Sequence, residues 1–301
     1  MQCTSTLLMI RPASFGYNEQ TAANNHFQVR VQNQNIILQQ QVLKEFDLLV
    51  ELLRNHQIEV IVVDDTEEQN RPDAIFPNNW FSSGNKGITL FPMFALNRRT
   101  EKRTDVIEHI KKITGIQVIN DMSAHENNSM FLEGTGSMVC DHQNKIIYAC
   151  LSVRTHKELV IEYAAFTGYS SCIFSANDIE GREIYHTNVM MCIGERFAIL
   201  CADAITDDSE RNKVISELER TQHKLILISH DQMLSFAGNA LQIKSKDGMP
   251  YLLISKTAFS SLYITQISEL EKFVSLIIAD VSAIEKTGGG SVRCMVAEIF
   301  T

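Results

Sequence analysis

Five polar residues recur along the chain at nearly constant spacing, and one of them is a cysteine. Asn79, Glu133, Asn188, Asn239 and Cys294 follow one another at intervals of about 50 residues. A thiol can act as a nucleophile, a carboxylate can orient a proton carrier, and asparagine amides can bind a polar substrate. Taken singly, an asparagine before a strand is commonly a turn residue and a cysteine in a strand is commonly an apolar filler. These simple explanations do not account for the regular interval.

The cysteine of this set stands just after a glycine-rich stretch. Gly288, Gly289 and Gly290 let the backbone take positive φ angles and approach a ligand closely, and a short β-prone run follows. We therefore expect Cys294 at the mouth of a strand, partly exposed and with neighbours that stabilise its thiolate. A second candidate, His186, stands just before Asn188 and is the natural proton carrier for such a thiol.

Composition excludes several classes of protein. The 301 residues are 45% hydrophobic and 21% charged, and no apolar run is long enough to span a bilayer. The seven cysteines lack metal-ligand spacing and their number is odd, which favours reduced thiols in a cytoplasm. A formal charge of −9 argues against nucleic acid as a partner. We expect a cytoplasmic protein with no metal, no cofactor and no membrane partner, and the sequence leaves a homo-oligomer open.

Hydrophobic spacing predicts the elements that must position these residues. The chain opens with a strand at 6–10 and a polar segment at 12–34, which is long enough to be either functional or a cover. A helix at 36–53 and a buried strand at 58–63 follow.

From residue 79 onward the chain repeats a unit of two strands joined by a turn, a helix and a returning strand. The four complete units occupy residues 79–119, 136–174, 189–228 and 240–278, with first strands at 79–83, 136–140, 189–193 and 240–244. A fifth unit begins at Cys294 and can be completed only by the N-terminal helix and strand. Such units cannot bury their faces alone, so we expect one α/β domain over residues 1–301, closed as a five-bladed propeller of pseudo-fivefold symmetry.

Four motifs resemble one known superfamily. They are FPNNWF at 76–81, LEGTG at 132–136, YHTN at 185–188 and GGGSVRC at 288–294. Their order and spacing are similar to those of the guanidine-modifying (amidinotransferase, or pentein) superfamily, which includes arginine deiminases and dimethylarginine dimethylaminohydrolases. The resemblance covers essentially the whole chain and is closest to the bacterial citrulline-utilisation hydrolases. It implies the five-bladed α/β propeller of that superfamily.

The resemblance also implies roles for individual residues. Two further stretches, at 97–101 and 151–155, are similar to loops whose arginines hold the substrate α-carboxylate, and 72–74 is similar to a substrate-contacting loop. Surface arginines next to helix starts remain the alternative for the two loops. The implied catalytic residues are Cys294, His186 and Glu133, and the implied substrate-binding residues are Asp73, Asn78, Asn79, Arg99, Arg154, Asn188 and Asn239.

The implied mechanism is covalent and needs no metal. Cys294 attacks the trigonal carbon of the substrate side chain, and His186 carries protons to the leaving amine and then from the hydrolytic water. Glu133 is expected to orient His186 and to favour its imidazolium form, which in turn favours the thiolate of Cys294.

Departures from the family pattern indicate the substrate. Arginine deiminases have aspartates at the positions of Asn79 and Asn188, and a buried guanidinium without carboxylate partners is costly. A neutral ureido group carries no such penalty, so we expect hydrolysis of citrulline to ornithine, ammonia and carbon dioxide. Thr135 replaces a glycine of many relatives. The alternatives are an arginine deiminase, a dimethylarginine hydrolase and, more remotely, a non-catalytic propeller that binds a partner.

Overall fold

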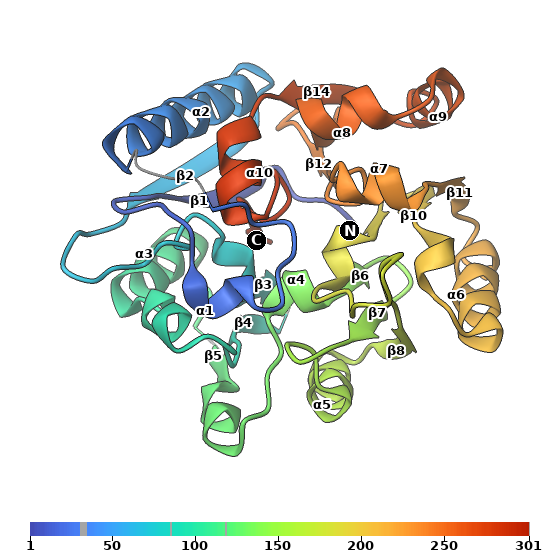
Figure 1. Ribbon diagram of the computed structural model, residues 1–301, viewed down its shortest axis with the longest axis horizontal. Coiled ribbons are helices and arrows are strands. Elements are labelled where there is room, and N and C mark those ends of the chain that lie inside the picture. The colour runs from blue at the N-terminus through green and yellow to red at the C-terminus, as the bar shows by residue number, and fades with distance from the viewer. Residues whose placement is uncertain (31–34, 85, 118, 301) are drawn as a thin grey trace.

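Five three-stranded sheets surround a common centre in the computed structural model (Figure 1), which describes residues 1–30, 35–84, 86–117 and 119–300. Four of the sheets combine an antiparallel hairpin with a third strand that returns through a helix and pairs in parallel. The crossover helices α2, α3, α5 and α6 lie on the outside of the ring, and α4 and α10 lie toward its centre (Figure 1). The expected five-bladed α/β propeller is confirmed.

The bounds of the elements follow the repeat, and each blade consists of a sheet and the helices that connect its strands. In the second blade, β3 (Phe81–Gly84), β4 (Gly87–Leu90) and β5 (Ile119–Asp121) form the sheet, and α3 (Thr104–Thr114) connects β4 to β5. In the third, β6 (Val139–Asp141), β7 (Ile146–Leu151) and β8 (Ser170–Ser175) form the sheet, and α5 (Lys157–Thr167) connects β7 to β8. In the fourth, β9 (Met191–Ile193), β10 (Phe197–Leu200) and β11 (Lys224–Leu227) form the sheet, α6 (Asp208–Arg220) connects β10 to β11, and α7 (His230–Leu234) follows. In the fifth, β12 (Leu241–Lys244), β13 (Pro250–Ser255) and β14 (Ser275–Ala279) form the sheet, and α8 (Lys256–Ser261) and α9 (Ile264–Leu270) connect β13 to β14.

The first sheet is built from both ends of the chain and closes the ring. β1 (Thr6–Arg11) pairs in parallel with β2 (Glu59–Asp64) across α2 (Asn35–Asn55), and antiparallel with β15 (Ala297–Glu298). The register places Leu7 opposite Glu298 and Leu8 opposite Ala297. The N-terminal helix and strand therefore complete the unit that the C-terminal strand begins, as predicted.

Short helical turns precede the first strands and were not predicted. The strand expected at 136–140 is instead α4 (Gly134–Ser137) followed by β6. Gly134 has a φ of +49°, and a Cβ there would lie 2.3 Å from the backbone oxygen of Asn78, so only glycine allows this close approach. Equivalent 3₁₀ turns, Pro77–Asn79 and Thr187–Val189, precede β3 and β9.

The glycine-rich stretch also differs from the expectation. Gly288 is the last residue of α10 (Ser282–Gly288), a helix that was not predicted, and of the three glycines only Gly289 has a positive φ, of 63°. Cys294 lies in the turns between α10 and β15 and not within a strand. A cap at Gly289 explains the local sequence, because a left-handed residue ends a helix most easily when it has no Cβ.

Two smaller expectations are also affected. The strand expected at 116–119 begins at Ile119 as β5. The polar segment expected at 12–34 contains α1 (Glu19–Ala22). Parts of three expected features, residues 31–34 of that segment, Asn85 of a turn and Val118 of a strand, lie outside the described residues.

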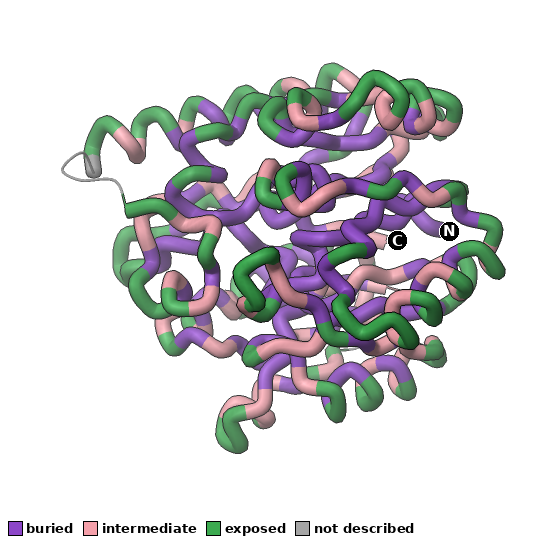
Figure 2. The backbone as a smooth tube through the Cα atoms, turned by 45° about the vertical axis from the view of Figure 1, so that its right-hand side comes forward, coloured by how far each residue is buried: buried purple, intermediate pink, exposed green. Residues whose placement is uncertain are grey.

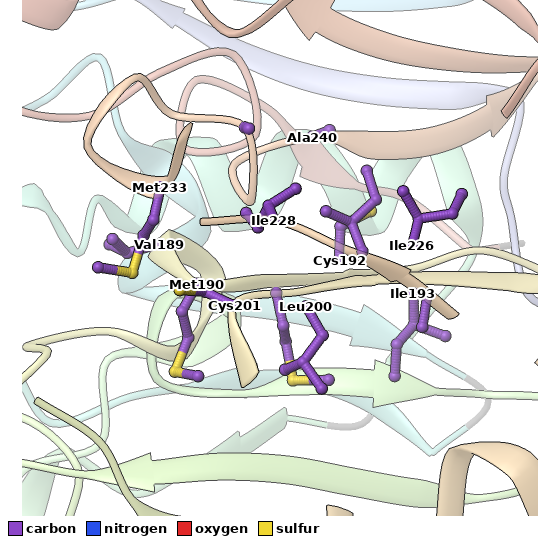
Figure 3. Packing of buried hydrophobic residues seen from close by; sticks show 14 of the residues in the cluster. Val189, Met190, Cys192, Ile193, Leu200, Cys201, Ile226, Ile228, Met233 and Ala240 are labelled. Carbon is purple, nitrogen blue, oxygen red and sulfur yellow. The ribbon is translucent and has the colours of Figure 1, made fainter. Parts of the chain in front are cut away.

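The strands carry the core. Buried residues concentrate on the strands around the centre, and exposed residues on the outer helices (Figure 2). In the fourth sheet, Cys192, Leu200 and Ile226 belong to one continuous apolar cluster (Figure 3). Strands that are apolar on both faces are expected when each sheet packs between two neighbours and a helix.

We predict that ring closure depends on apolar packing behind β1. Leu8 is fully buried, opposite Ala297 and in one cluster with Trp80. Leu8→Ala should lower the free energy of unfolding by about 2–5 kcal/mol, measured by urea denaturation. Leu227→Ala is the control, because Leu227 is 52% exposed. This variant should change the free energy of unfolding by less than about 0.5 kcal/mol. Equal effects of the two variants would contradict the prediction.

Candidate active site

Two asparagine amides hold the sulfur of Cys294. Asn188 Nδ2 lies 3.4 Å and Asn239 Nδ2 lies 3.2 Å from Sγ. Cys294 is 4% exposed, in contrast to the partly exposed thiol expected from sequence. Burial raises the pKa of the Cys294 thiol, and the two amide hydrogen bonds only partly oppose this effect. The free protein therefore holds a thiol and not a thiolate at neutral pH.

The amide of Asn239 has a fixed orientation. Its Oδ1 accepts a hydrogen bond from the backbone N–H of Arg293 at 3.2 Å, and a backbone N–H can only donate. Its Nδ2 therefore faces Cys294 Sγ and the backbone oxygen of Asn188, 3.1 Å away. The structure thus places Asn239, which was expected to bind substrate, against the sulfur of Cys294.

His186 and Glu133 form a buried pair. His186 Nε2 lies 2.8 Å from Glu133 Oε2, and Arg154 Nη1 lies 3.4 Å from the same oxygen. Burial alone raises the pKa of Glu133, but Arg154 and the hydrogen bond with His186 together lower it well below its usual range. Glu133 therefore stays ionised and orients the imidazole ring, leaving Nδ1 as the atom available for proton transfer.

The imidazolium expected at His186 is not favoured. Burial lowers the pKa of His186 to about 4, and the positive charges of Arg154 and Arg98 also lower it. The hydrogen bond to Glu133 raises this pKa, as expected, but does not outweigh burial. At neutral pH both His186 and Cys294 are neutral. The sequence-based expectation of an imidazolium and thiolate pair in the free protein is therefore corrected to a neutral pair.

Gly136 lets Asn79 and His186 approach each other. A Cβ on Gly136 would lie 2.4 Å from Asn79 Nδ2 and 2.7 Å from His186 Nδ1. The two nitrogen atoms therefore flank the same small volume, although they come from different blades. The repeated positions form two groups: Asn79 and the Glu133–His186 pair lie beside Gly136, and Asn188 and Asn239 surround the sulfur of Cys294. The short stretch from His186 to Asn188 connects the two groups, and we call these six residues the catalytic cluster.

Arg98 fixes the amide of Asn79. Arg98 Nη1 donates to Asn79 Oδ1 at 2.7 Å, while the Nε and Nη2 atoms each donate to Glu101 at 2.9 Å. A guanidinium cannot accept a hydrogen bond, so the oxygen of Asn79 must face Arg98 and Nδ2 must face away. Asn79 Nδ2 is buried and has no hydrogen-bond partner among the described residues.

The structure brings Arg98, and not Arg99, to this cluster. Arg99 Nε donates to the backbone oxygen of Met93 at 3.0 Å and lies 3.6 Å from Glu126 Oε2, and its guanidinium lies over the ring of Phe131. Adjacent residues of a 3₁₀ helix, here Leu96–Glu101, point in different directions. The useful sequence signal was Glu101, an acidic residue three positions after Arg98.

Arg154 and Asp73 place two opposite charges near the cluster. Arg154 is 2% exposed, and its guanidinium lies 4.9 Å from the centre of the Tyr185 ring. Asp73 is 2% exposed and lies 3.8 Å from Arg98 at the closest atoms. Burial raises the pKa of Asp73, and Arg98 opposes this effect.

Ten buried side-chain polar atoms have no hydrogen-bond partner among the described residues. Five of the ten belong to other residues, namely Gln28 Oε1, Asp65 Oδ2, Tyr148 Oη, Glu285 Oε2 and Thr287 Oγ1. The remaining five are Asp73 Oδ1, Asn78 Nδ2, Asn78 Oδ1, Asn79 Nδ2 and Asn188 Oδ1. Buried polar groups are nearly always hydrogen-bonded, and each unpaired one costs about 1–3 kcal/mol. The remaining five all belong to residues expected to bind substrate, so a polar ligand is the natural partner. The backbone oxygen of Asn78 accepts from Thr135 Oγ1 at 3.3 Å, which ties the unusual threonine to this region.

The N-terminal segment covers the cluster. Asn18 Nδ2 donates to Asp73 Oδ2 at 2.7 Å, Asn24 Oδ1 accepts from Arg154 Nε at 2.8 Å, and Val29 N–H donates to the oxygen of Lys286 at 2.8 Å. Figure 1 shows this segment running across the ring beside α10. The length of this polar segment predicted that it is either functional or a cover, but not these contacts.

The described residues contain no group of three or more His, Cys, Asp and Glu side chains arranged to hold a metal ion. In the same part of the chain, no helix is long and apolar enough to cross a membrane.

A family model described as N,N-dimethylarginine dimethylhydrolase, eukaryotic, matches residues 11–301. The chain belongs to this family. The match confirms the expected guanidine-modifying superfamily. The matched family consists of hydrolases that act on carbon–nitrogen bonds, and this protein is therefore a hydrolase of that kind. By sequence, no curated protein matches the chain.

Solved structures show the same fold at low sequence identity. The product-bound N-terminal domain of ArgZ, a cyanobacterial arginine dihydrolase, superposes with a TM-score of 0.74 at 16% identity, over 98% of this chain and 97% of that domain. The chain spans only 40% of full-length ArgZ, with a TM-score of 0.74 at 15% identity and 98% of this chain covered. A dimethylarginine dimethylaminohydrolase bound to S-methyl-L-thiocitrulline gives a TM-score of 0.67 at 14% identity, over 99% of this chain and 100% of that chain.

We predict that the space left by Gly136 is essential for catalysis. Gly136→Ala should displace Asn79 or His186 and lower kcat/KM by about 100-fold, since small displacements of reacting groups have effects of this size. Gly84→Ala is the matched control, because its Cβ would meet no atom within 4 Å. Ammonia release measures activity, and circular dichroism checks the fold. A fully active Gly136→Ala variant would show that the two nitrogen atoms need not be close.

Proposed function

We propose that this protein hydrolyses the ureido group of citrulline, giving ornithine, ammonia and carbon dioxide. One observation carries the proposal: the amide of Asn79 presents a hydrogen-bond donor to the cluster, because Arg98 holds its oxygen. The membership of the family supports the reaction class, and the orientation of this amide supports a substrate that contains an acceptor.

A ureido group matches the unpaired atoms better than a guanidinium does. A ureido group has one carbonyl acceptor and N–H donors, whereas a guanidinium has donors only and carries a charge. Asn79 Nδ2 can donate to the carbonyl, and Asn188 Oδ1 can accept from an N–H group. The N–H groups of a guanidinium would instead face the donor Asn79 Nδ2. Neither the guanidinium N–H nor the Asn79 amide N–H would then have an acceptor.

The charged ends of the amino acid need partners of opposite sign. Arg154 can bind an α-carboxylate through its planar donors, and Asp73 Oδ1 can accept from an α-ammonium. In the covered state Asn24 and Asn18 hold these two side chains, so the N-terminal segment must give up some of these contacts when a substrate enters. The interactions of Arg99 with Met93 and Glu126 do not favour the carboxylate role expected from sequence.

A neutral thiol and a neutral imidazole suit a reaction in which the thiol proton is transferred to the imidazole as the carbon–sulfur bond forms. As Cys294 Sγ bonds to the ureido carbon, its proton passes to His186, and from there to the amine that leaves. Water, activated by the now neutral His186, then breaks the carbon–sulfur bond and returns a proton to the sulfur. The carbamate released decomposes to carbon dioxide and the second amine. Glu133 stabilises the imidazolium that exists only during transfer.

Arginine is the second candidate substrate. ArgZ is an arginine dihydrolase and another neighbour is a dimethylarginine dimethylaminohydrolase, so related folds act on guanidino compounds. The unpaired carboxylate oxygen of Asp73, beside this cluster, favours a cation. A propeller that only binds a partner is the remaining alternative, and measurable turnover excludes it.

We predict a preference for citrulline over arginine and methylarginine. Two mismatched buried contacts at about 1–3 kcal/mol each correspond to a kcat/KM ratio on the order of 100. Asn79→Asp should remove the donor and lower kcat/KM for citrulline by about tenfold or more, whereas Asn212→Asp, on the exposed side of α6, should have no effect. Arginine turnover equal to or faster than citrulline turnover would refute the substrate assignment.

We predict that Cys294→Ser abolishes turnover and leaves the fold intact, because the hydroxyl is a far weaker nucleophile of similar size. Cys140→Ser, at a half-buried thiol outside the cluster, is the control and should keep its activity. Mass spectrometry of the acid-quenched wild-type protein should detect a covalent substrate adduct that is absent from Cys294→Ser. Near-native turnover by Cys294→Ser would disprove the covalent mechanism.

A further inference from the structure

A cavity of about 440 Å³ lies away from the catalytic cluster. The β3–β4 hairpin, the β6–β7 hairpin and the last turns of α5 enclose it, and Phe300 forms part of its wall. None of the six residues of the catalytic cluster lines it. Its volume falls in the range of small-molecule sites, which is about 300–1,000 Å³.

The wall of this cavity is aromatic. Tyr163, Phe166, Tyr169 and Phe300 line it and are only half-buried, so the cavity leaves part of their rings uncovered. His142 lies between two of them: its Nδ1 is 3.0 Å from the Tyr169 hydroxyl, and its ring centre is 4.9 Å from that of Phe300. Burial lowers the pKa of His142 to about 4, so this ring adds a polar but neutral surface. Aromatic faces and edges of this kind favour a planar apolar ligand.

The charge at the cavity is positive, against the trend of the protein. Lys86 and Lys145 stand on the two hairpins, and none of the described residues that line the cavity is acidic, although the formal net charge is −9. Both lysines are exposed, and within the described part of the chain neither has a carboxylate partner. Other lysines, such as Lys102 and Lys256, do pair with carboxylates. The two free ammonium groups therefore provide a site for an anionic group at the edge of an apolar cavity.

We propose that this cavity binds a small aromatic anion, that is, a planar ring carrying a carboxylate or a phosphate group. The ring packs among Tyr163, Phe166 and Tyr169, and the anionic group pairs with Lys86 and Lys145. Ring and anion together account for the two properties of the wall, since an uncharged aromatic leaves the lysines without a partner and a simple anion leaves the rings uncovered. The site lies between the second and third sheets, which also supply Asn79 and Glu133, but it shares no residue with the catalytic cluster.

Isothermal titration calorimetry on the full chain tests the proposal with two probes. Indole-3-acetate carries a carboxylate and adenosine 5′-monophosphate carries a phosphate, so the better probe identifies the anionic group. We expect saturable one-to-one binding of at least one probe, unchanged in Cys294→Ser and not displaced by citrulline. Indole-3-acetamide, which has the ring without the charge, should bind at least about tenfold more weakly than indole-3-acetate if the carboxylate is the preferred group.

Variants of the wall separate this site from nonspecific binding. The double variant Lys86→Gln/Lys145→Gln should weaken the probe that binds by about tenfold or more, and Phe166→Ala should weaken it independently. The matched control is Lys246→Gln/Lys272→Gln, which removes the same charge from surface positions that pair with Glu59 and Glu269. Failure of both probes to bind the wild type, equal weakening by the two lysine pairs, or displacement by citrulline would each overturn the proposal. Circular dichroism confirms that each variant is folded.

Discussion

The carboxylate of Glu133 is fully buried, and the side chains around it compensate its charge. His186, Arg154 and the backbone N–H of Phe94, at 3.0 Å, all contact it. An uncompensated charge in such a place costs about 3–5 kcal/mol, so each partner is held firmly. Because the partners include His186, the proposed proton carrier, and Arg154, the residue proposed to bind the α-carboxylate, one carboxylate fixes the relative positions of both side chains.

A second constraint is the orientation of amides. An asparagine side chain presents a donor and an acceptor that are nearly isosteric, and the neighbours decide which of them faces the cluster. Arg98 decides it for Asn79 and the backbone N–H of Arg293 decides it for Asn239. These two neighbours therefore set which hydrogen-bonding atoms the amides present to the cluster.

Much of this arrangement could be predicted from sequence. The interval between Asn79, Glu133, Asn188, Asn239 and Cys294 predicted the closed ring, because a rotational repeat brings equivalent positions to one axis. The motif around His186 supplied the proton carrier, whose position beside Glu133 agrees with the implied pairing. These features depend on order along the chain, which sequence records directly.

The remaining features depend on direction and environment. Arg98 and Arg99 are adjacent and identical in type, so only the path of the 3₁₀ helix decides which one points inward. The neutral state of His186 follows from burial and from two arginines distant in sequence, and the close approach at Gly134 follows from the backbone of another blade. None of these relations leaves a local pattern in the sequence.

The closure of the ring by β1 and β15 has a consequence for synthesis. During translation β1 emerges first of the strands and β15 last, so the first sheet stays incomplete until the final strand is made. Cys294, the proposed nucleophile, also emerges only shortly before β15. A nascent chain that already carries His186 and Glu133 therefore still lacks Cys294 and has one unpaired side of β1. We expect the late growing chain to be inactive and to depend on rapid completion to avoid pairing with other chains.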